Sequence, residues 1–414
     1  MELDAIPQPE LEQIERAGGV ELVVGFFGMG QLEDGSDAAA ITRDALGELA
    51  APMRAVVVCN NGIHSGANGD DRSPIAAVCS LPLPGPAETP LQSISRAYRR
   101  VFAIGSKLGV RACAFIASGE RQVSREWISR LVQPVLDLGF DCVAPCYSRQ
   151  KMEGLLNRNV VAPLHRALYG EQLENPMGPD FGVSGKLLER IRARESARRA
   201  GSEHNVLAAI AATAAAGGFQ VCETHLGDRT QHPTDWGKLS ELLAEVLGAI
   251  FVEMEVGAAY WQSIRGSKAL PRFGAPEVSR EEGGTVDVRG MIESFQLGTQ
   301  NLQDVWGLIL PPTTLLELKR LSRVADDRFR IQDQLWVRIV YDFALAHRLR
   351  TISRDHLLRS ITPLYLGWIA SYALEMETAG FAQVESRLER LSKAYEDNKS
   401  YLVSRWRWPD RFNP

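Results

Sequence analysis

The chain has 414 residues, of which 45% are hydrophobic, and a formal net charge of −5 at pH 7. That length and composition can supply a large core in two domains, and the lack of a basic stripe argues against nucleic acid as a partner. No apolar run reaches the roughly 18–20 residues of a membrane span, and the first residues lack the pattern of a signal peptide. We therefore expect a cytoplasmic protein whose six scattered cysteines are buried free thiols.

The chain begins with alternating strands and helices. Residues 1–19 predict a short helix and linker, and the apolar, β-branched run 20–27 predicts a buried strand. A helix over 38–49 leads to a second strand over 53–59. Strand, helix and strand in this order begin a Rossmann-like α/β sheet, which binds ligands at the carboxyl ends of its strands. The G-x-G after the first strand lacks the third glycine of a dinucleotide site, so we exclude a dehydrogenase.

Two further strands are expected in the same mainly parallel sheet, over 111–116 and 140–145. The proline-rich segment 71–90 predicts irregular chain. Helices are expected over 91–108, 184–199, 207–216 and 238–260.

The last third of the chain has a helical pattern. Prolines and glycines break the periodicity over 265–287, which predicts a linker, and residues 288–414 are almost wholly helical in pattern. Apolar residues repeat at three and four over 381–395, which favours core packing; the same repeat would also suit a homodimer through the C-terminal helices. Trp406 and Trp408 predict an anchor folded back on the body.

One stretch organises the central part of the chain. It runs N-P-M-G-P-D-F-G-V-S-G-K-L over 175–187, where turn residues surround a single acid, Asp180, and the chain then enters a helix through Ser184. A carboxylate on a braced loop at a helix entrance is well placed to meet a ligand hydroxyl. The alternative is that Asp180 only caps the next helix.

Three segments precede this stretch in a characteristic order: W-I-S-R-L-V-Q-P-V-L over 127–136, F-D-C-V-A-P-C-Y-S-R over 140–149 and P-L-H-R-A-L-Y-G over 163–170. Together the four segments resemble the nucleotide-sugar glycosyltransferases of the GT-A fold. The likeness is greatest to the bacterial glucosylglycerate, mannosylglycerate and glucosyl-3-phosphoglycerate synthases. It covers about residues 20–260 and, more weakly, the helical tail.

The resemblance implies a fold and a division into domains. We expect a GT-A-like α/β domain over 20–262, with a mainly parallel sheet flanked by helices. A linker over 263–287 and a helical C-terminal domain over 288–414 should follow. The implied reaction moves a hexose from a nucleotide-diphosphate sugar to a small hydroxyl acceptor such as a glycerate-type compound.

The resemblance also implies site residues. Asp180 and Glu203 are the candidate catalytic residues. The candidate contacts to the nucleotide sugar are Gly25, Phe26, Asn60, Asn61 and Ser118. The candidate contacts to the acceptor are Tyr147, Arg149, Asn157, Asp180 and Gly182.

The donor side departs from the family pattern. The family's metal-binding Asp-x-Asp falls on Ala-Ser-Gly at 117–119, so Glu120 is the acid that remains, and it either contributes to a weak metal site or begins a loop. His225 or His232 would take the place of the histidine that completes the metal site in the family. The family's phosphate-binding lysine is also missing; arginines of the 91–108 helix would replace it or are solvated. We therefore expect Mg²⁺ or Mn²⁺ only together with the nucleotide sugar.

Three functions remain open. The first is a hexosyltransferase with a weakened metal site, in which Asn60, Glu120, Asp180 and His225 line one cleft. The second is a catalytically degraded homologue that binds a sugar, a nucleotide or a protein without turnover. The third is a hydrolase that pairs Glu120 with Asp180.

Overall fold

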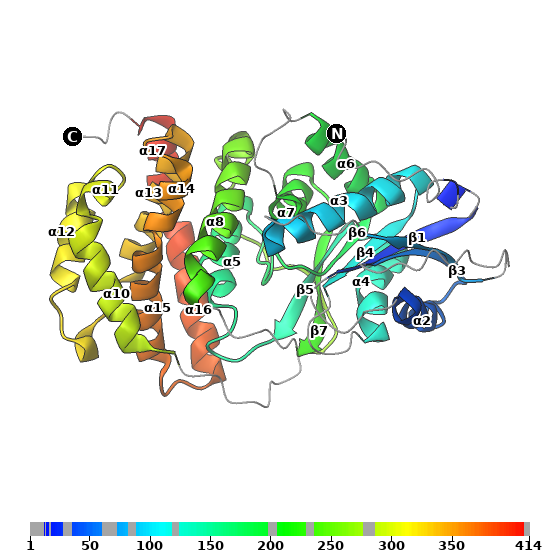
Figure 1. Cartoon of the computed structure of the whole chain (residues 1–414), viewed down its shortest axis with the longest axis horizontal. Helices are drawn as coiled ribbons and strands as arrows, with labels where there is room; N and C mark the ends of the chain where they lie inside the picture. Colours follow the sequence, from blue (N-terminus) through cyan, green and yellow to red (C-terminus); the bar gives the residue numbers. More distant parts are fainter. Residues whose placement is uncertain are drawn as a thin grey trace. The chain divides into compact units, whose positions relative to one another are not determined.

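The structure is a computed structural model, and it combines a strand-rich region with a helical one (Figure 1). It describes residues 12, 14–15, 18–27, 35–59, 73–81, 88–117, 124–197, 205–228, 236–275 and 286–409.

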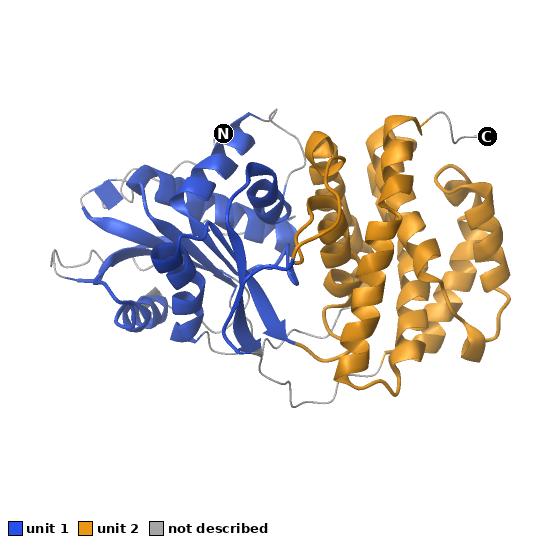
Figure 2. Cartoon of the chain, turned by 180° about the vertical axis from the view of Figure 1, so that it is seen from behind, with its two compact units in different colours: residues 1–148, 173–231, 269–279 blue, residues 149–172, 232–268, 280–414 orange. Residues whose placement is uncertain are grey.

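Two compact units make up the chain, and each is assembled from separate stretches (Figure 2). Unit 1 contains residues 1–148, 173–231 and 269–279, and unit 2 contains residues 149–172, 232–268 and 280–414. The expected boundaries at 262 and 288 therefore do not coincide with these units. Residues 149–172 and 232–262, expected in the sheet domain, belong to unit 2, where α5 packs on α16 and α8 packs on α13 and α14.

An eight-stranded sheet in the order β3-β2-β1-β4-β6-β5-β7-β8 is the framework of unit 1. Neighbouring strands are parallel except at β6, which is antiparallel to both β4 and β5. This confirms the predicted mainly parallel sheet flanked by helices, and it is consistent with a GT-A-like fold. The strands are β1 (Val20–Phe27), β2 (Arg54–Cys59), β3 (Ile75–Ser80), β4 (Ala112–Ala117), β5 (Cys142–Ser148), β6 (Phe181–Ser184), β7 (Val221–Asp228) and β8 (Arg272–Phe273).

Helices cover both faces of the sheet. Two separate apolar clusters lie on its two sides, one containing residues of α3, α6 and α7 and the other containing residues of α2 and α4. Strands that are buried on both faces read as nearly continuous apolar runs, which is why β1, β2 and β4 were predictable. These helices are α2 (Gly35–Leu46), α3 (Pro90–Leu108), α4 (Arg125–Leu138), α6 (Gly185–Ser196) and α7 (Val206–Gly217).

Three short strands escaped the sequence pattern. The prediction of irregular chain over 71–90 is wrong at β3, because its apolar run sits between proline-rich flanks that hide it. The four residues of β6 follow a proline and glycine turn, and the two residues of β8 lie in the expected linker. Runs as short as β6 and β8 carry too little periodicity to be recognised, and pairing with distant strands stabilises them.

Unit 2 is built from helices, as predicted for the C-terminal region. Leu335, Ile339 and Phe343 are buried on one side of α13, and Val384, Leu391 and Tyr395 are buried on α16. The helices are η1 (Asn157–Val161), α5 (Ala162–Tyr169), η2 (Trp236–Lys238), α8 (Leu239–Val256), α9 (Ala258–Trp261), α10 (Val288–Asn301), α11 (Gln303–Gly307), α12 (Pro312–Leu321), η3 (Asp326–Arg328), α13 (Asp333–Leu349), α14 (Arg354–Ser360), α15 (Thr362–Met376), α16 (Phe381–Asp397) and α17 (Lys399–Arg407).

The C-terminal anchor is only partly as expected. Trp406 is buried and meets Trp261 edge to face, with ring centroids 5.2 Å apart, whereas Trp408 is 60% exposed. Trp406 therefore fixes α17 to the body of unit 2.

Two general predictions can be compared with this structure. All six cysteines are free and buried, which confirms their assignment as core thiols. Among the described residues, no helix is both long enough and apolar enough to span a membrane.

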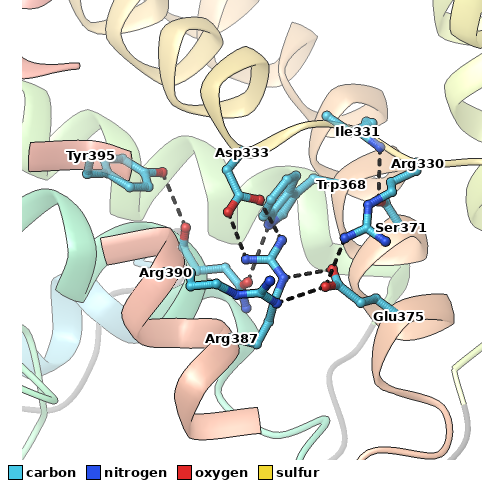
Figure 3. A network of polar contacts seen from close by, with 10 residues as sticks. Arg330, Ile331, Asp333, Trp368, Ser371, Glu375, Arg387, Arg390 and Tyr395 are labelled. Carbon is cyan, nitrogen blue, oxygen red and sulfur yellow. Dashed lines mark hydrogen bonds and ion pairs between the residues drawn. The ribbon is translucent and has the colours of Figure 1, made fainter. Parts of the chain in front are cut away.

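A buried ion network joins the helices of unit 2 (Figure 3). The Arg387 guanidinium donates two hydrogen bonds to Asp333, at 2.6 and 3.0 Å, and one to Glu375 at 2.7 Å. Arg387 is only 3% exposed and lies over the Trp368 ring, 5.5 Å from its centroid. One cation thus ties α13, α15 and α16 together.

Candidate functional site

The candidate site lies at the carboxyl end of β4. Strand order reverses between β1 and β4, and open α/β sheets bind ligands outside the carboxyl ends of the strands at such a point. Because β6 is antiparallel to β4, the residue that precedes β6 lies at the same edge as the last residue of β4. That residue is Asp180, and the Ala117 amide donates to its Oδ1 at 2.7 Å.

Asp180 joins two of the motifs identified in the sequence. Its Oδ2 accepts a hydrogen bond from the Tyr147 hydroxyl at the end of β5, and the Asp180 side chain is fully buried. The helix that follows is capped by Ser184, whose Oγ accepts from the Leu187 amide at 3.1 Å. The alternative that Asp180 caps this helix is therefore wrong, while the predicted helix entry at Ser184 is confirmed.

The loop that carries Asp180 is held at several points. Asn175 donates from Nδ2 to the Pro145 carbonyl at 2.9 Å, and the Gly178 amide closes a turn on the Asn175 carbonyl at 3.1 Å. A Cβ at Gly178 would lie 2.8 Å from the Pro145 ring. The loop is thus seated on β5 from its first residues.

An aromatic cluster supports the other end of this loop. Tyr98 of α3 stacks on Phe115 of β4, with ring centroids 3.9 Å apart and planes 4° apart, and Phe27 lies 5.2 Å from Tyr98. The Tyr98 hydroxyl donates to the Pro179 carbonyl at 2.7 Å. Sequence reasoning missed Tyr98, because a tyrosine on the buried face of a helix gives no signal of its partner.

Three of the predicted contact residues are packing positions. A Cβ at Gly182 would lie 2.0 Å from the Leu131 carbonyl, so glycine allows α4 to approach β6 closely. A Cβ at Gly25 would lie 2.6 Å from a methyl group of Val101 on α3, and the Phe26 side chain lies in the core beside α2 and α4. These three residues serve the packing of the sheet against its helices, so a ligand could contact only their backbone atoms.

His225 lies on β7, next to Cys146 of β5. The imidazole is buried, its backbone carbonyl accepts from Arg130 Nη1 at 2.8 Å, and Gly274 packs against it. Burial lowers the pKa of His225; the positive charges of Arg272 and Arg130 act in the same direction, against Glu174. Two nearby cations oppose the binding of a divalent metal there.

The described residues can also be compared with what a metal site requires. Within the described parts of the chain, no group of three or more His, Cys, Asp or Glu side chains could hold a metal ion. Ala117 is the first residue of the Ala-Ser-Gly segment, and its backbone amide donates a hydrogen bond to Asp180. Glu120, the acid proposed as a metal ligand, lies outside the described residues.

A second buried acid lies on the same strand as His225, and sequence reasoning missed it. Glu223 is 1% exposed and accepts from Arg272 of β8 at 2.7 Å and from the Glu174 amide at 2.6 Å. Burial and the Glu174 charge raise the pKa of Glu223, while Arg272 lowers it. Arg272 also pairs with Glu174 at 2.8 Å, so this cluster links β7 and β8 to the start of the Asp180 loop.

Other predicted residues lie elsewhere. Arg149 and Asn157 belong to unit 2, where Asn157 begins η1 and the Arg149 guanidinium fills the space beside Gly154. On α3, Arg96 pairs with Glu88 at 2.8 Å and Arg99 with Glu195 at 3.0 Å. Several predicted residues lie outside the described residues: Asn60, Asn61, Ser118, Glu120, Glu203 and His232.

Comparison with known proteins gives a sparse result. No family model matches the sequence, and no curated protein matches it. Among solved structures, the chain is similar to glucosyl-3-phosphoglycerate synthase of Mycobacterium tuberculosis in complex with Mg²⁺ and UDP, at 18% identity and a TM-score of 0.37 over 59% of this chain and 82% of that one. The same enzyme with Mn²⁺, UDP-glucose and phosphoglyceric acid gives 16% identity and a TM-score of 0.33 over 61% and 84%. Similarity at this level does not by itself indicate a shared activity.

Proposed function

We propose that the protein is a hexosyltransferase that takes a hexose from a nucleotide-diphosphate sugar and gives it to a small hydroxyl acceptor of the glycerate type. The proposal rests first on the resemblance of the segments between 127 and 187. The structural observation that carries it is the contact of Asp180 with Tyr147 and the Ala117 amide. This contact brings two of those segments, 140–149 and 175–187, together at the edge where open α/β sheets bind ligands.

The proposed transfer places the acceptor near Tyr147 and Asp180, with the donor at the carboxyl ends of β1 and β4. Arg149 and Asn157 stay proposed acceptor contacts, and Asn60, Asn61 and Ser118 stay proposed donor contacts. For Gly25 and Gly182 only backbone contacts are proposed, because a side chain there would clash. Glu203 stays a proposed catalytic residue.

Metal would enter only with the donor. No group of three or more His, Cys, Asp or Glu side chains that could hold a metal ion is found among the described residues, and Glu120 lies outside them, so we route no step of the transfer through a metal. A diphosphate supplies several oxygen ligands, and Mg²⁺ is often held by one or two carboxylates plus phosphates. The free protein is therefore expected to show no tight Mn²⁺ or Mg²⁺ binding in calorimetry, and Glu120→Ala should abolish any gain in nucleotide affinity that Mn²⁺ brings. Tight binding to the free protein would contradict this.

The test is a thermal-shift screen of nucleoside diphosphates and nucleotide sugars, with and without Mn²⁺. We expect a nucleotide sugar to raise the melting temperature, and incubation of UDP-glucose with 3-phosphoglycerate or glycerate to release UDP. A protein that binds no nucleotide in any combination would not be a transferase of this kind.

A second candidate function is the degraded homologue, which binds without turnover. Two points favour it: residues 117–119, where the resemblance would put the family's Asp-x-Asp, are Ala-Ser-Gly, and the Asp180 carboxylate is buried. A nucleotide sugar that binds equally well with and without Mn²⁺, and in Glu120→Ala, while no acceptor yields product would support this alternative.

A further inference from the structure

We propose that Asp180 is a positioning residue of this site, and that the Tyr98 hydroxyl on α3 determines where its carboxylate lies. The inference rests on the proposed function and refines it, since Asp180 otherwise stands as the candidate catalytic acid or base. It concerns three side chains of unit 1 that come from α3, β5 and the loop before β6.

The contacts of Asp180 indicate a holding role. Oδ1 accepts from the Ala117 amide and Oδ2 accepts from the Tyr147 hydroxyl, so each carboxylate oxygen already receives a proton donor from the protein. A general base must lie within hydrogen-bond reach of the hydroxyl that it deprotonates. A fully buried carboxylate that receives donors from two strands is better placed to fix the Tyr147 hydroxyl and the end of β4.

The position of Asp180 depends on the preceding peptide unit. Pro179 lies directly before Asp180, and its carbonyl accepts from Tyr98 at 2.7 Å. A phenylalanine would fill the aromatic cluster with Phe115 and Phe27 equally well, because those contacts use only the ring. The hydroxyl therefore adds to the ring packing a hydrogen bond that holds the 179–180 peptide unit.

The helix that carries Tyr98 is a fixed reference. At its start Thr89 and Gln92 form a reciprocal capping box, and Gly109 ends it in the left-handed conformation. Tyr98 is fully buried near the middle of this 19-residue helix. A hydrogen bond from a capped, packed helix can thus define the loop position more sharply than the loop's own residues would.

The functional test compares three variants with a matched control. Tyr98→Phe removes the bond to Pro179, Asp180→Asn keeps the shape of the side chain, and Tyr147→Phe removes the bond to Asp180. Tyr341→Phe in unit 2 is the control, since its buried hydroxyl likewise donates to a carbonyl, that of Tyr395 at 2.6 Å. Tyr98→Phe and Tyr341→Phe each lose a hydrogen bond between neutral groups, which corresponds to about a fivefold change in an equilibrium constant. Tyr147→Phe loses a bond to a carboxylate, for which the change is about tenfold or more.

With UDP-glucose as donor and 3-phosphoglycerate as acceptor, Tyr98→Phe should raise the acceptor KM about fivefold, and Tyr147→Phe about tenfold or more, both with little change in kcat. Asp180→Asn should raise the acceptor KM and keep the shape of the pH profile of kcat. Tyr341→Phe should alter neither. Loss of turnover in Asp180→Asn together with loss of the acidic limb of the profile would assign Asp180 as the base and overturn the proposal.

A second measurement does not depend on activity. Hydrogen exchange of the Ala117 amide should accelerate in Asp180→Ala, and by about fivefold in Tyr98→Phe, while Tyr341→Phe leaves it unchanged. Unchanged exchange in both site variants would overturn the positioning role even in an active enzyme. If exchange responds as expected but no nucleotide binds, the proposed function fails and the positioning role stands.

Discussion

Two buried charges, one in each unit, are satisfied in different ways: Arg387 in unit 2 and Asp180 in unit 1. In unit 2 the Arg387 guanidinium is held by two carboxylates, so charges of opposite sign meet and each helix supplies one partner (Figure 3). In unit 1 the Asp180 carboxylate is held by an amide and a phenol at the end of a strand. The ion pairs of Arg387 join three helices to one another, whereas Asp180 lies at the edge where open α/β sheets bind ligands, so we assign a structural role to the first and a role in the site to the second.

The largest loss of unfolding free energy is expected from a substitution in the ion network of Arg387. Arg387→Met removes the buried guanidinium from Asp333 and leaves Glu375 with Arg330 and Arg390, whose side chains are both more than half exposed. Loss of one partner of a buried pair costs about 3–5 kcal/mol, and the partial exposure of Asp333 puts the expected loss at the lower end of that range. Burial alone would raise the pKa of Glu375, but Arg387 and the neighbouring arginines lower it overall, so this acid is charged in the native state. Denaturant unfolding measures the loss.

Arg390→Met provides the control for that variant. Arg390 bonds to the same acid, Glu375, at 3.1 Å, but its side chain is 62% exposed. An exposed pair contributes about 0–1 kcal/mol. Equal losses of unfolding free energy in the two variants would mean that burial does not distinguish them.

The next largest effect is expected in unit 1, at Gly182 of the strand that follows Asp180. Gly182→Ala places a methyl group 2.0 Å from the Leu131 carbonyl, which forces α4 away from β6. Overpacking of this kind costs about 1–3 kcal/mol. Gly18→Ala is the control, because no atom lies within 4 Å of the position that its methyl group would take. A melting temperature for Gly182→Ala equal to that of the control would show that the sheet yields at this point.

The pH dependence of stability sharpens the comparison further. Asp342 on α13 is 1% exposed, and the Tyr401 hydroxyl reaches its two oxygens at 2.8 and 3.0 Å, with Arg405 Nε at 3.4 Å. Burial raises the pKa of Asp342 to about 7, although Arg405 and Tyr401 lower it. Between about pH 4 and 7 the folded protein keeps a proton that the unfolded chain releases.

The unfolding free energy should therefore fall as pH rises through this window, by at most about 1.4 kcal/mol per pH unit from this group. Asp342→Asn cannot titrate, so its curve should fall less steeply than that of the wild type. Urea unfolding at pH 5, 6 and 7 gives both curves. Parallel curves for the two proteins would show that Asp342 does not titrate between pH 5 and 7 in the folded protein.

The smallest effect is expected on the outside of α16. Its apolar side packs within unit 2, and Phe381 at its start is 72% exposed. Phe381→Asp should change stability by no more than about 0.5 kcal/mol. Light scattering should give the mass of one chain for the wild type and for Phe381→Asp. If the wild type is a dimer and Phe381→Asp is a monomer, the homodimer through the C-terminal helices is supported instead.

The sequence predicted the long elements and missed what depends on distant partners. β1, β2, β4 and β5 are apolar runs that any sheet would bury, and Ser184 is a capping residue whose bond closes three residues away. β6 is too short to show a period, and it exists because β4 and β5 flank it. Likewise Asp180 was recognisable as a loop acid, but its bond to Ala117 spans 63 residues of sequence, beyond the reach of a local pattern.

The position of β6 between β4 and β5 also affects the order in which the sheet can assemble during translation. Strands β3, β2, β1 and β4 are complete once residue 117 has been synthesised, and β5 once residue 148 has. The strand that joins them ends at residue 184, so for a stretch of translation β4 and β5 both lack their shared neighbour. Open strand edges attract other chains. A nascent chain that stalls between residues 148 and 180 is therefore expected to be the form that most needs chaperone protection.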